Sequence, residues 1–127
     1  DLASMPAVAA AHSEAAVRLV ARHGTQAPEI VALGETLDLL RPLVAGRPFL
    51  EAEVAWAVRH ELALSIDDVL SRRLRLGPEL GDARATVADR VAEIMATELR
   101  WSQAECERQR DAYLETAGRE YAVPGRV

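Results

Sequence analysis

The stretch from residue 49 to residue 76, FLEAEVAWAVRHELALSIDDVLSRRLRL, constrains the fold of this chain more than any other. Its apolar residues recur at helical spacing rather than alternating as in a strand, which predicts helices over residues 50–64 and 65–76. Ser65 followed by Asp68 is a capping pattern that marks the start of the second helix. The first helix is apolar on two opposite sides, which is typical of a helix enclosed by neighbours. One side carries Leu50, Val54, Ala57 and Val58, and the other carries Ala52, Trp56 and Ala63.

Composition favours a fold made of helices alone. Half of the residues are apolar but only 4% are aromatic. Because good helix formers dominate and no run alternates strictly, we expect an all-α fold, a compact orthogonal bundle of five or six helices. The length suits a single domain over residues 1–127, with residues 1–11 as an interdomain connection. The longest helix is expected over residues 83–99. Its apolar stripe comprises Val87, Val91, Ile94 and Met95.

Punctuating residues predict the other helix boundaries. Residues 12–23 are expected to form a helix. The next helix should carry Pro28 in its first turn, where a missing amide is harmless, and should end at Gly34. Ser102 and Glu105 form a second capping box, which predicts the start of the last helix.

The charge balance and the single cysteine exclude several kinds of protein. A formal net charge of −5 and a pI near 5.2 disfavour a nucleic-acid module, which needs a positive field. Cys106 is the only cysteine, so no disulfide forms within the chain, and a reducing compartment is expected. No apolar run approaches the roughly 20 residues of a membrane span. The chain starts at Asp1 without a leader pattern, and we expect it to be a piece of a longer protein.

One carboxylate lies within an apolar side of the first predicted helix. Glu61 projects from that side, where an unpaired charge would be costly. Arg72 and Arg73 follow one helix later and can grip a carboxylate with parallel hydrogen bonds. We therefore predict that Glu61 is buried and held by one or both arginines. Asp68 stands four residues before Arg72, as in a common helical ion pair. Together with His60, these residues form the predicted structural polar cluster.

No motif predicts a catalytic residue, a cofactor-binding residue or a metal ligand. His60 and Glu61 are neighbours on a helix, so their side chains diverge by about 100° and do not converge on one ion. Neither glycine-rich phosphate loop is present. The turn at Ser65 has the outline of a DNA-binding helix-turn-helix. However, Asp67 and Asp68 would place two carboxylates at the end that enters the groove, where they repel phosphates.

Two strings in the central stretch carry a family resemblance: A-E-V-x-x-A-V-R-H-E, and D-D-V-L-x-R-R followed by glycine. They comprise Ala52, Glu53, Val54, Ala57, Val58, Arg59, His60 and Glu61, then Asp67, Asp68, Val69, Leu70, Arg72, Arg73 and Gly77. The strings resemble the C-terminal helical domain of FAD-dependent, aerobic, quinone-linked glycerol-3-phosphate dehydrogenases. Flanking matches at residues 23–28 and 101–105 extend the resemblance over residues 16–113. Leu74 departs from the family, which usually carries Thr there, so a hydroxyl contact at this position is absent.

The resemblance implies a parent oxidoreductase of glycerol metabolism. Such an enzyme oxidises sn-glycerol 3-phosphate to dihydroxyacetone phosphate with FAD and passes the electrons to quinone. It would be cytoplasmic and peripheral, at the inner face of the cytoplasmic membrane. Mitochondrial members carry calcium-binding loops after this domain, and their absence here suits a bacterial enzyme.

The resemblance also implies what this chain does within the parent. The flavoprotein body, with its FAD and its substrate site, would be an N-terminal domain and the expected partner of this one. The chain alone is therefore expected to bind no FAD, to be inactive and to have a structural role. An oligomer and the identity of the electron acceptor stay open. The alternative is a free-standing helical interaction or regulatory module, including a DNA-binding one.

Overall fold

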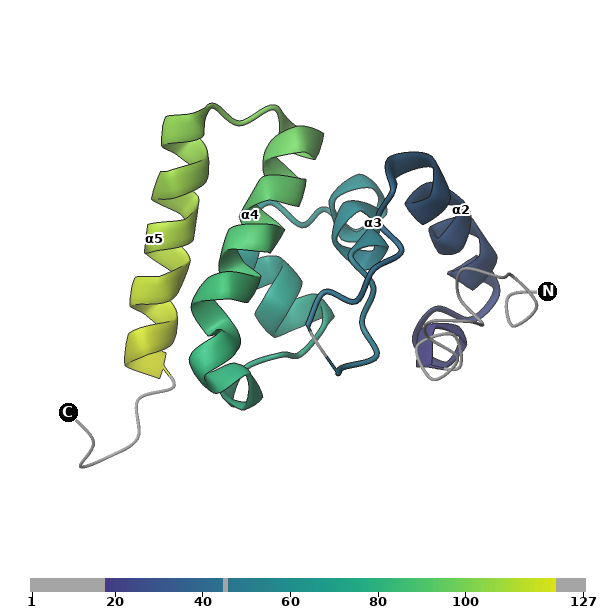
Figure 1. Cartoon of the computed structure of the whole chain (residues 1–127), viewed down its shortest axis with the longest axis horizontal. Coiled ribbons are helices and arrows are strands. Elements are labelled where there is room, and N and C mark those ends of the chain that lie inside the picture. Colours follow the sequence, from purple (N-terminus) through teal and green to yellow (C-terminus); the bar gives the residue numbers. More distant parts are fainter. Residues whose placement is uncertain (1–17, 45, 121–127) are drawn as a thin grey trace. The chain divides into compact units, whose positions relative to one another are not determined.

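The computed structural model describes residues 18–44 and 46–120, and the regular elements in those ranges are helical (Figure 1). Residues 18–23 are helical. They are followed by the 3-10 helix η2 (Gly24–Gln26), α2 (Ala27–Leu37), α3 (Ala52–His60), the π-helical η3 (Asp68–Arg73), the 3-10 segment η4 (Pro78–Ala83), α4 (Arg84–Leu99) and α5 (Gln103–Glu120). The two ranges contain no strand, only an isolated bridge between Pro42 and Leu50. The predicted all-α class is confirmed.

The chain divides into two units, one ending at Trp56 and the other beginning at Ala57, so that the boundary lies inside α3. The prediction that residues 1–127 form one domain stays a prediction. The expected interdomain connection, residues 1–11, lies outside the described residues.

In the first unit, α2 continues past its predicted end. Gly34 lies inside the helix, which ends at Leu37 and is followed by Asp38 in a left-handed conformation with φ 57°. The predicted end at Gly34 is wrong because this glycine serves packing instead. A Cβ at Gly34 would lie 2.6 Å from Leu40 Cδ2 and 3.0 Å from Ala52 Cβ. The missing side chain therefore lets α2 approach the start of α3.

The loop between α2 and α3 folds back on itself. The Leu43 amide donates to the Phe49 carbonyl at 2.7 Å, and the Glu51 amide donates to the Arg41 carbonyl at 2.9 Å. These bonds satisfy backbone groups that a buried loop would otherwise leave unpaired. They also fix Phe49 directly before the first turn of α3.

In the second unit, α3 ends at His60, four residues before the predicted end. The next residues cannot continue the helix because Leu62 has a left-handed φ of 58°. The Ala63 amide still reaches back to the Ala57 carbonyl at 3.1 Å, and the Ala63 side chain is buried. The predicted second helix is likewise shorter than expected: residues 66–73 are helical, and η3 makes up most of them.

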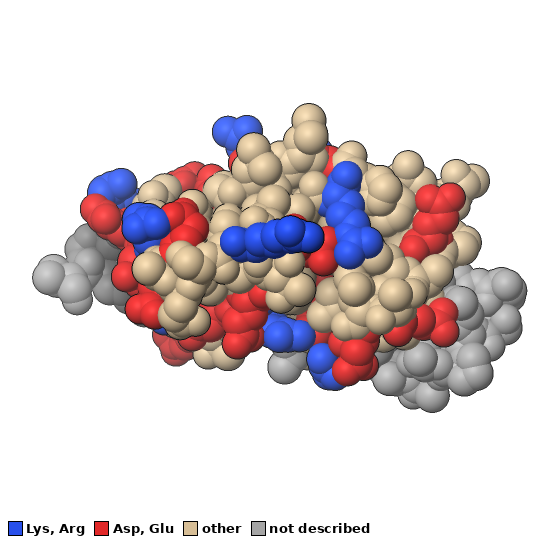
Figure 2. Space-filling view, turned by 90° about the horizontal axis from the view of Figure 1, so that it is seen from above, with Lys and Arg blue, Asp and Glu red and all other residues tan. Residues whose placement is uncertain are grey.

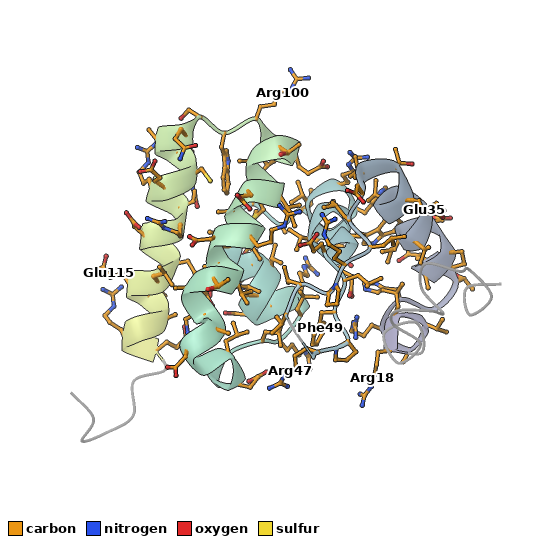
Figure 3. The ribbon with its side chains drawn as sticks, viewed as in Figure 1. Arg18, Glu35, Arg47, Phe49, Arg100 and Glu115 are labelled. Carbon is orange, nitrogen blue, oxygen red and sulfur yellow. The ribbon has the colours of Figure 1, made fainter. Side chains whose placement is uncertain are left out.

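Helices α4 and α5 form a hairpin in the second unit and lie side by side (Figure 1). The predicted apolar stripe of α4 is buried, with Tyr113 and Ala117 buried on α5. Arg100, with φ 59°, ends α4, and its side chain points away from the connection (Figure 3). The prediction that α4 is the longest helix is wrong, because α5 has 18 residues and α4 has 16. None of the helices in the described ranges has both the length and the apolarity to cross a membrane.

Candidate functional site

The predicted link between Glu61 and the paired arginines exists, but with a different acceptor. Arg73 Nη2 donates to the backbone carbonyl of Glu61 at 2.6 Å, and Glu61 itself is only half-buried. The prediction of a buried Glu61 carboxylate held by arginine is therefore wrong. The prediction fails because α3 ends early, at His60, so that Glu61 no longer lies on the apolar side of the helix. Carbonyl groups at the end of a helix lack helical partners, and Arg73 satisfies one of them.

The rest of the predicted polar cluster lies near the surface. Arg72 Nε stands 3.9 Å from Asp68 Oδ1, with side chains 77% and 30% exposed, and His60 is exposed. The Ser65 hydroxyl accepts the Asp68 amide at 3.1 Å, while the Asp68 carboxylate accepts the Leu64 amide at 3.1 Å. The capping pair thus forms as predicted, with its carboxylate reaching one residue farther back. An exposed pair at this distance contributes at most about 1 kcal/mol.

The buried polar centre lies in the first unit, at Glu53. Only 2% of this residue is exposed. Arg22 donates to both of its oxygens: Nη2 lies 2.6 Å from Oε1 and 2.7 Å from Oε2, and Nε lies 3.0 Å from Oε1. Arg22 Nη2 also donates to the Pro48 carbonyl at 3.2 Å. A planar guanidinium that grips a carboxylate in this way forms one of the stronger polar contacts in proteins.

Three further groups complete this site, which we call the Glu53 cluster: Arg22, His23, Phe49, Leu50 and Glu53. His23 Nε2 lies 3.0 Å from Glu53 Oε1, and the Leu50 amide donates to Oε2 at 2.8 Å. The Arg22 guanidinium stacks over the Phe49 ring, 4.5 Å from its centroid. Phe49 lies next to the exposed Arg47 in the loop before α3 (Figure 3).

Local sequence explains why the cluster forms there. Glu53 stands three residues after Leu50 at the start of α3, where its carboxylate satisfies an amide that no helical carbonyl reaches. This is one arm of a capping box without the usual hydroxyl. A negative charge in a first turn also complements the helix dipole. The three-residue spacing of Leu50 and Glu53 could have predicted the bond between the Leu50 amide and the Glu53 carboxylate. No sequence pattern could have predicted the pairing of Glu53 with Arg22, which lies 31 residues away.

The contacts of Glu53 are those of a buried ion pair within the fold. A carboxylate offers about four acceptor positions, and Arg22, His23 and the Leu50 amide fill those of Glu53. Throughout residues 18–44 and 46–120, every buried side-chain nitrogen or oxygen has a hydrogen-bond partner. In the same ranges, no group of three His, Cys, Asp or Glu residues could hold a metal ion.

The second unit has a comparable but more exposed connection between its helices. Arg59 on α3 donates from Nε to Oε1 of Glu98 on α4, and from Nη2 to Oε2 at 3.1 Å. The hydrogen bond to Glu98 raises the pKa of Arg59, so that its charge is secure. On α4, Arg84 donates to the Tyr113 hydroxyl at 3.0 Å and to the Gly77 carbonyl at 2.8 Å. These contacts fix helices to one another.

On the face that Figure 2 shows, the charged side chains of the described residues form no large patch of one sign. Acidic and basic side chains are scattered among other residues on the face that Figure 2 shows. Cys106, on α5, is half-buried, and burial together with the carboxylate of Glu93 raises the pKa of its thiol. A raised pKa leaves less thiolate, the reactive form, at neutral pH. The Cys106 thiol therefore lacks the lowered pKa of a nucleophilic cysteine.

Comparison with known proteins gives a consistent result. Residues 2–106 match the family model described as the C-terminal domain of alpha-glycerophosphate oxidase. The chain is 38% identical over 90 residues to the mitochondrial glycerol-3-phosphate dehydrogenase SDP6 of Arabidopsis thaliana, covering 71% of this chain and 14% of that protein. It is 32% identical over 96 residues to the glycerol-3-phosphate dehydrogenase of Mycobacterium leprae (strain TN), covering 75% and 16%. The chain therefore spans only about one-seventh to one-sixth of the length of these relatives. No solved structure matches it.

Proposed function

Because this chain belongs to the family of C-terminal domains of alpha-glycerophosphate oxidase, we infer that it is the C-terminal accessory domain of an FAD-dependent glycerol-3-phosphate dehydrogenase. The observation that carries this proposal is the family match over residues 2–106, joined by relatives that are named glycerol-3-phosphate dehydrogenases. The matched segment makes up 14% and 16% of these relatives. The reaction therefore belongs to the larger remainder of the polypeptide.

The parent enzyme in this proposal oxidises sn-glycerol 3-phosphate to dihydroxyacetone phosphate. FAD, which the preceding part of the polypeptide would hold, would supply the two-electron oxidation, and quinone at the inner face of the cytoplasmic membrane would be the electron acceptor. The work of this domain is structural, and its partner is the N-terminal flavoprotein body.

The saturated Glu53 cluster supports the structural role. Only 2% of Glu53 is exposed, and Arg22, His23 and the Leu50 amide all lie within hydrogen-bond distance of its carboxylate. The same carboxylate joins the helical run at residues 18–23 to the start of α3, so that its bonds define the shape of the first unit.

The test uses the full-length polypeptide and, separately, this chain. The purified full-length protein should be yellow and should reduce a soluble quinone when sn-glycerol 3-phosphate is added, while this chain alone should be colourless and inactive. Measuring oxygen uptake and peroxide in parallel distinguishes a quinone-linked enzyme from an oxidase. A full-length protein without flavin or without activity on this substrate would refute the proposal. Peroxide formation at the rate of substrate oxidation would refute the quinone assignment alone.

A further inference from the structure

Two leucines on one short loop are exposed to solvent at a conformational cost. Leu62 is 82% exposed and Leu64 is 63% exposed, and Val20 is the other large exposed hydrophobic residue in the described ranges. Leu62 also has a φ of 58°. A left-handed backbone is unfavourable for a side chain of this kind. The left-handed φ follows the end of α3, as it follows α2 at Asp38 and α4 at Arg100. The exposure of Leu62 beside Leu64, however, is not explained by packing within its own unit.

The loop presents these leucines rigidly. Ala63, between them, is buried, and its amide is bonded to the Ala57 carbonyl at 3.1 Å. The Leu64 amide is bonded to the Asp68 carboxylate at 3.1 Å. Because Ala63 is buried and hydrogen-bonded to α3, the side chains of Leu62 and Leu64 on either side of it are exposed to solvent and do not pack against the helices.

Two arginines flank the leucines. Arg73 bonds the carbonyl of Glu61, the residue before Leu62. Arg72 pairs with Asp68, whose other oxygen holds the Leu64 amide. We call Leu62, Leu64, Arg72 and Arg73 the leucine–arginine surface. Both arginines are exposed, so a partner with carboxylates around an apolar patch would complement it.

We propose that the leucine–arginine surface docks onto the larger, preceding part of the same polypeptide. This inference rests on the proposed function, since it takes the flavoprotein body as the occupant. Two observations favour that occupant: the relatives extend far beyond the matched segment, and the matched family is by description a C-terminal domain. A net charge of −5 opposes docking on an anionic membrane.

The experiment places a photo-crosslinking amino acid, p-benzoylphenylalanine, at position 64 of the full-length polypeptide. After irradiation, we expect an adduct within one chain, between residue 64 and a segment that precedes this domain, identified by peptide mass spectrometry. The same label at the exposed Val20 position is the matched control and should give at least tenfold less of that adduct. Adding Leu62→Asp should abolish the adduct at position 64, whereas adding Val20→Asp should leave it.

Each other outcome contradicts the docking proposal. An adduct between two chains would assign the surface to a second copy. An adduct with lipid, in the presence of phosphatidylglycerol–phosphatidylethanolamine vesicles, would assign it to the membrane. Equal labelling from positions 20 and 64, or no protein adduct, would show that the surface is unoccupied. An active flavoenzyme without the adduct refutes docking alone. An adduct without flavin or activity refutes the proposed function alone.

Discussion

At the scale of single residues, the cost of a buried charge decides which carboxylate matters. Glu53 is enclosed, and its bonds to Arg22, His23 and the Leu50 amide replace the water that it loses. Glu61 is only half-buried and keeps access to water. The two glutamates lie eight residues apart in the same stretch, yet only Glu53 depends on a charged side chain from another helix.

Replacing the cation of the Glu53 cluster should destabilise the protein strongly. In Arg22→Met the buried carboxylate keeps no arginine, and breaking a buried pair typically costs about 3–5 kcal/mol. Arg119 is the matched control, because its pair with Glu115 on α5 is exposed and is worth about 0–1 kcal/mol. Urea unfolding of both variants measures the difference. Equal losses for Arg22→Met and Arg119→Met would contradict a structural role for the cluster.

The thiol of Cys106 should react slowly with alkylating reagents. Its pKa is raised above the ordinary value of 9.0 by burial and by nearby carboxylates, Glu93 first among them. The pH midpoint of iodoacetamide alkylation should therefore be higher in the folded protein than in urea. Glu93→Gln should lower the folded midpoint, because it removes one of the negative charges. A folded midpoint at or below the unfolded one would contradict this assignment.

Sequence patterns identified the residues of this region but not their partners. Ser65 and Asp68 form the predicted cap because both residues lie within one turn. The Glu61 prediction failed because it assumed that α3 continues through Leu64, which would have placed the carboxylate on the apolar side. Arg22 and Glu53 could not be paired in advance, since only tertiary structure brings residues so far apart in the chain together.

At the scale of elements, tertiary contacts decide where the helices end. The apolar stripe of α4 was predictable because periodicity records which face is buried. The ends of α2 and α3 were not predictable, because Gly34 packs closely against Leu40 and Leu62 adopts a left-handed φ. Helix propensity alone predicts different end residues for both helices.

Two glycine substitutions should change stability in opposite directions. Gly34→Ala places a Cβ 2.6 Å from Leu40 Cδ2 and 3.0 Å from Ala52 Cβ, and such overpacking typically costs about 1–3 kcal/mol. Gly118→Ala, in α5, meets nothing within 4 Å and should add up to about 1 kcal/mol from helix propensity. Thermal unfolding of the two variants tests the pair. A stabilised Gly34→Ala would show that Leu40 moves aside freely.

The start of α5 should make stability depend on pH in acid. The Ser102 hydroxyl accepts the Glu105 amide at 3.0 Å, while the Glu105 carboxylate accepts from Arg108 and Gln109 instead of completing the box. Arg108 first, then Gln109, lowers the pKa of Glu105 below its ordinary value of 4.5. The carboxylate therefore stabilises the fold above that value, and this contribution is lost as the pH falls through the lower, folded pKa.

Glu105→Gln should flatten that dependence. Unfolding free energies measured at neutral pH and below pH 4.5 should differ less in the variant than in the natural chain. Arg108→Gln should have the same effect, because it removes the largest cause of the lowered pKa. If Glu105→Gln reduces the pH dependence of the unfolding free energy and Arg108→Gln does not, the Glu105 carboxylate depends on a partner other than Arg108.

At the scale of the whole molecule, the class of fold and the family followed from the sequence. Helical periodicity and the absence of strict alternation sufficed for an all-α prediction, and the two strings in the central stretch sufficed for the family. What the chain does for its parent could not be predicted in the same way. That depends on surface residues such as Leu62, whose exposure follows from a local backbone conformation.

The bond between Arg22 and Glu53 also limits how far the protein can be shortened from its N-terminal side and still fold. A fragment that starts at Gly24 keeps every helix from η2 onward but discards both side chains that hold the Glu53 carboxylate. We expect such a fragment to be largely insoluble when it is expressed, whereas one that starts at Arg18 should be recovered folded. Solubility and circular dichroism of the two would show this, and equal recovery would contradict it. A domain limit drawn at the first complete helix would therefore fall six residues too late to give a folded protein.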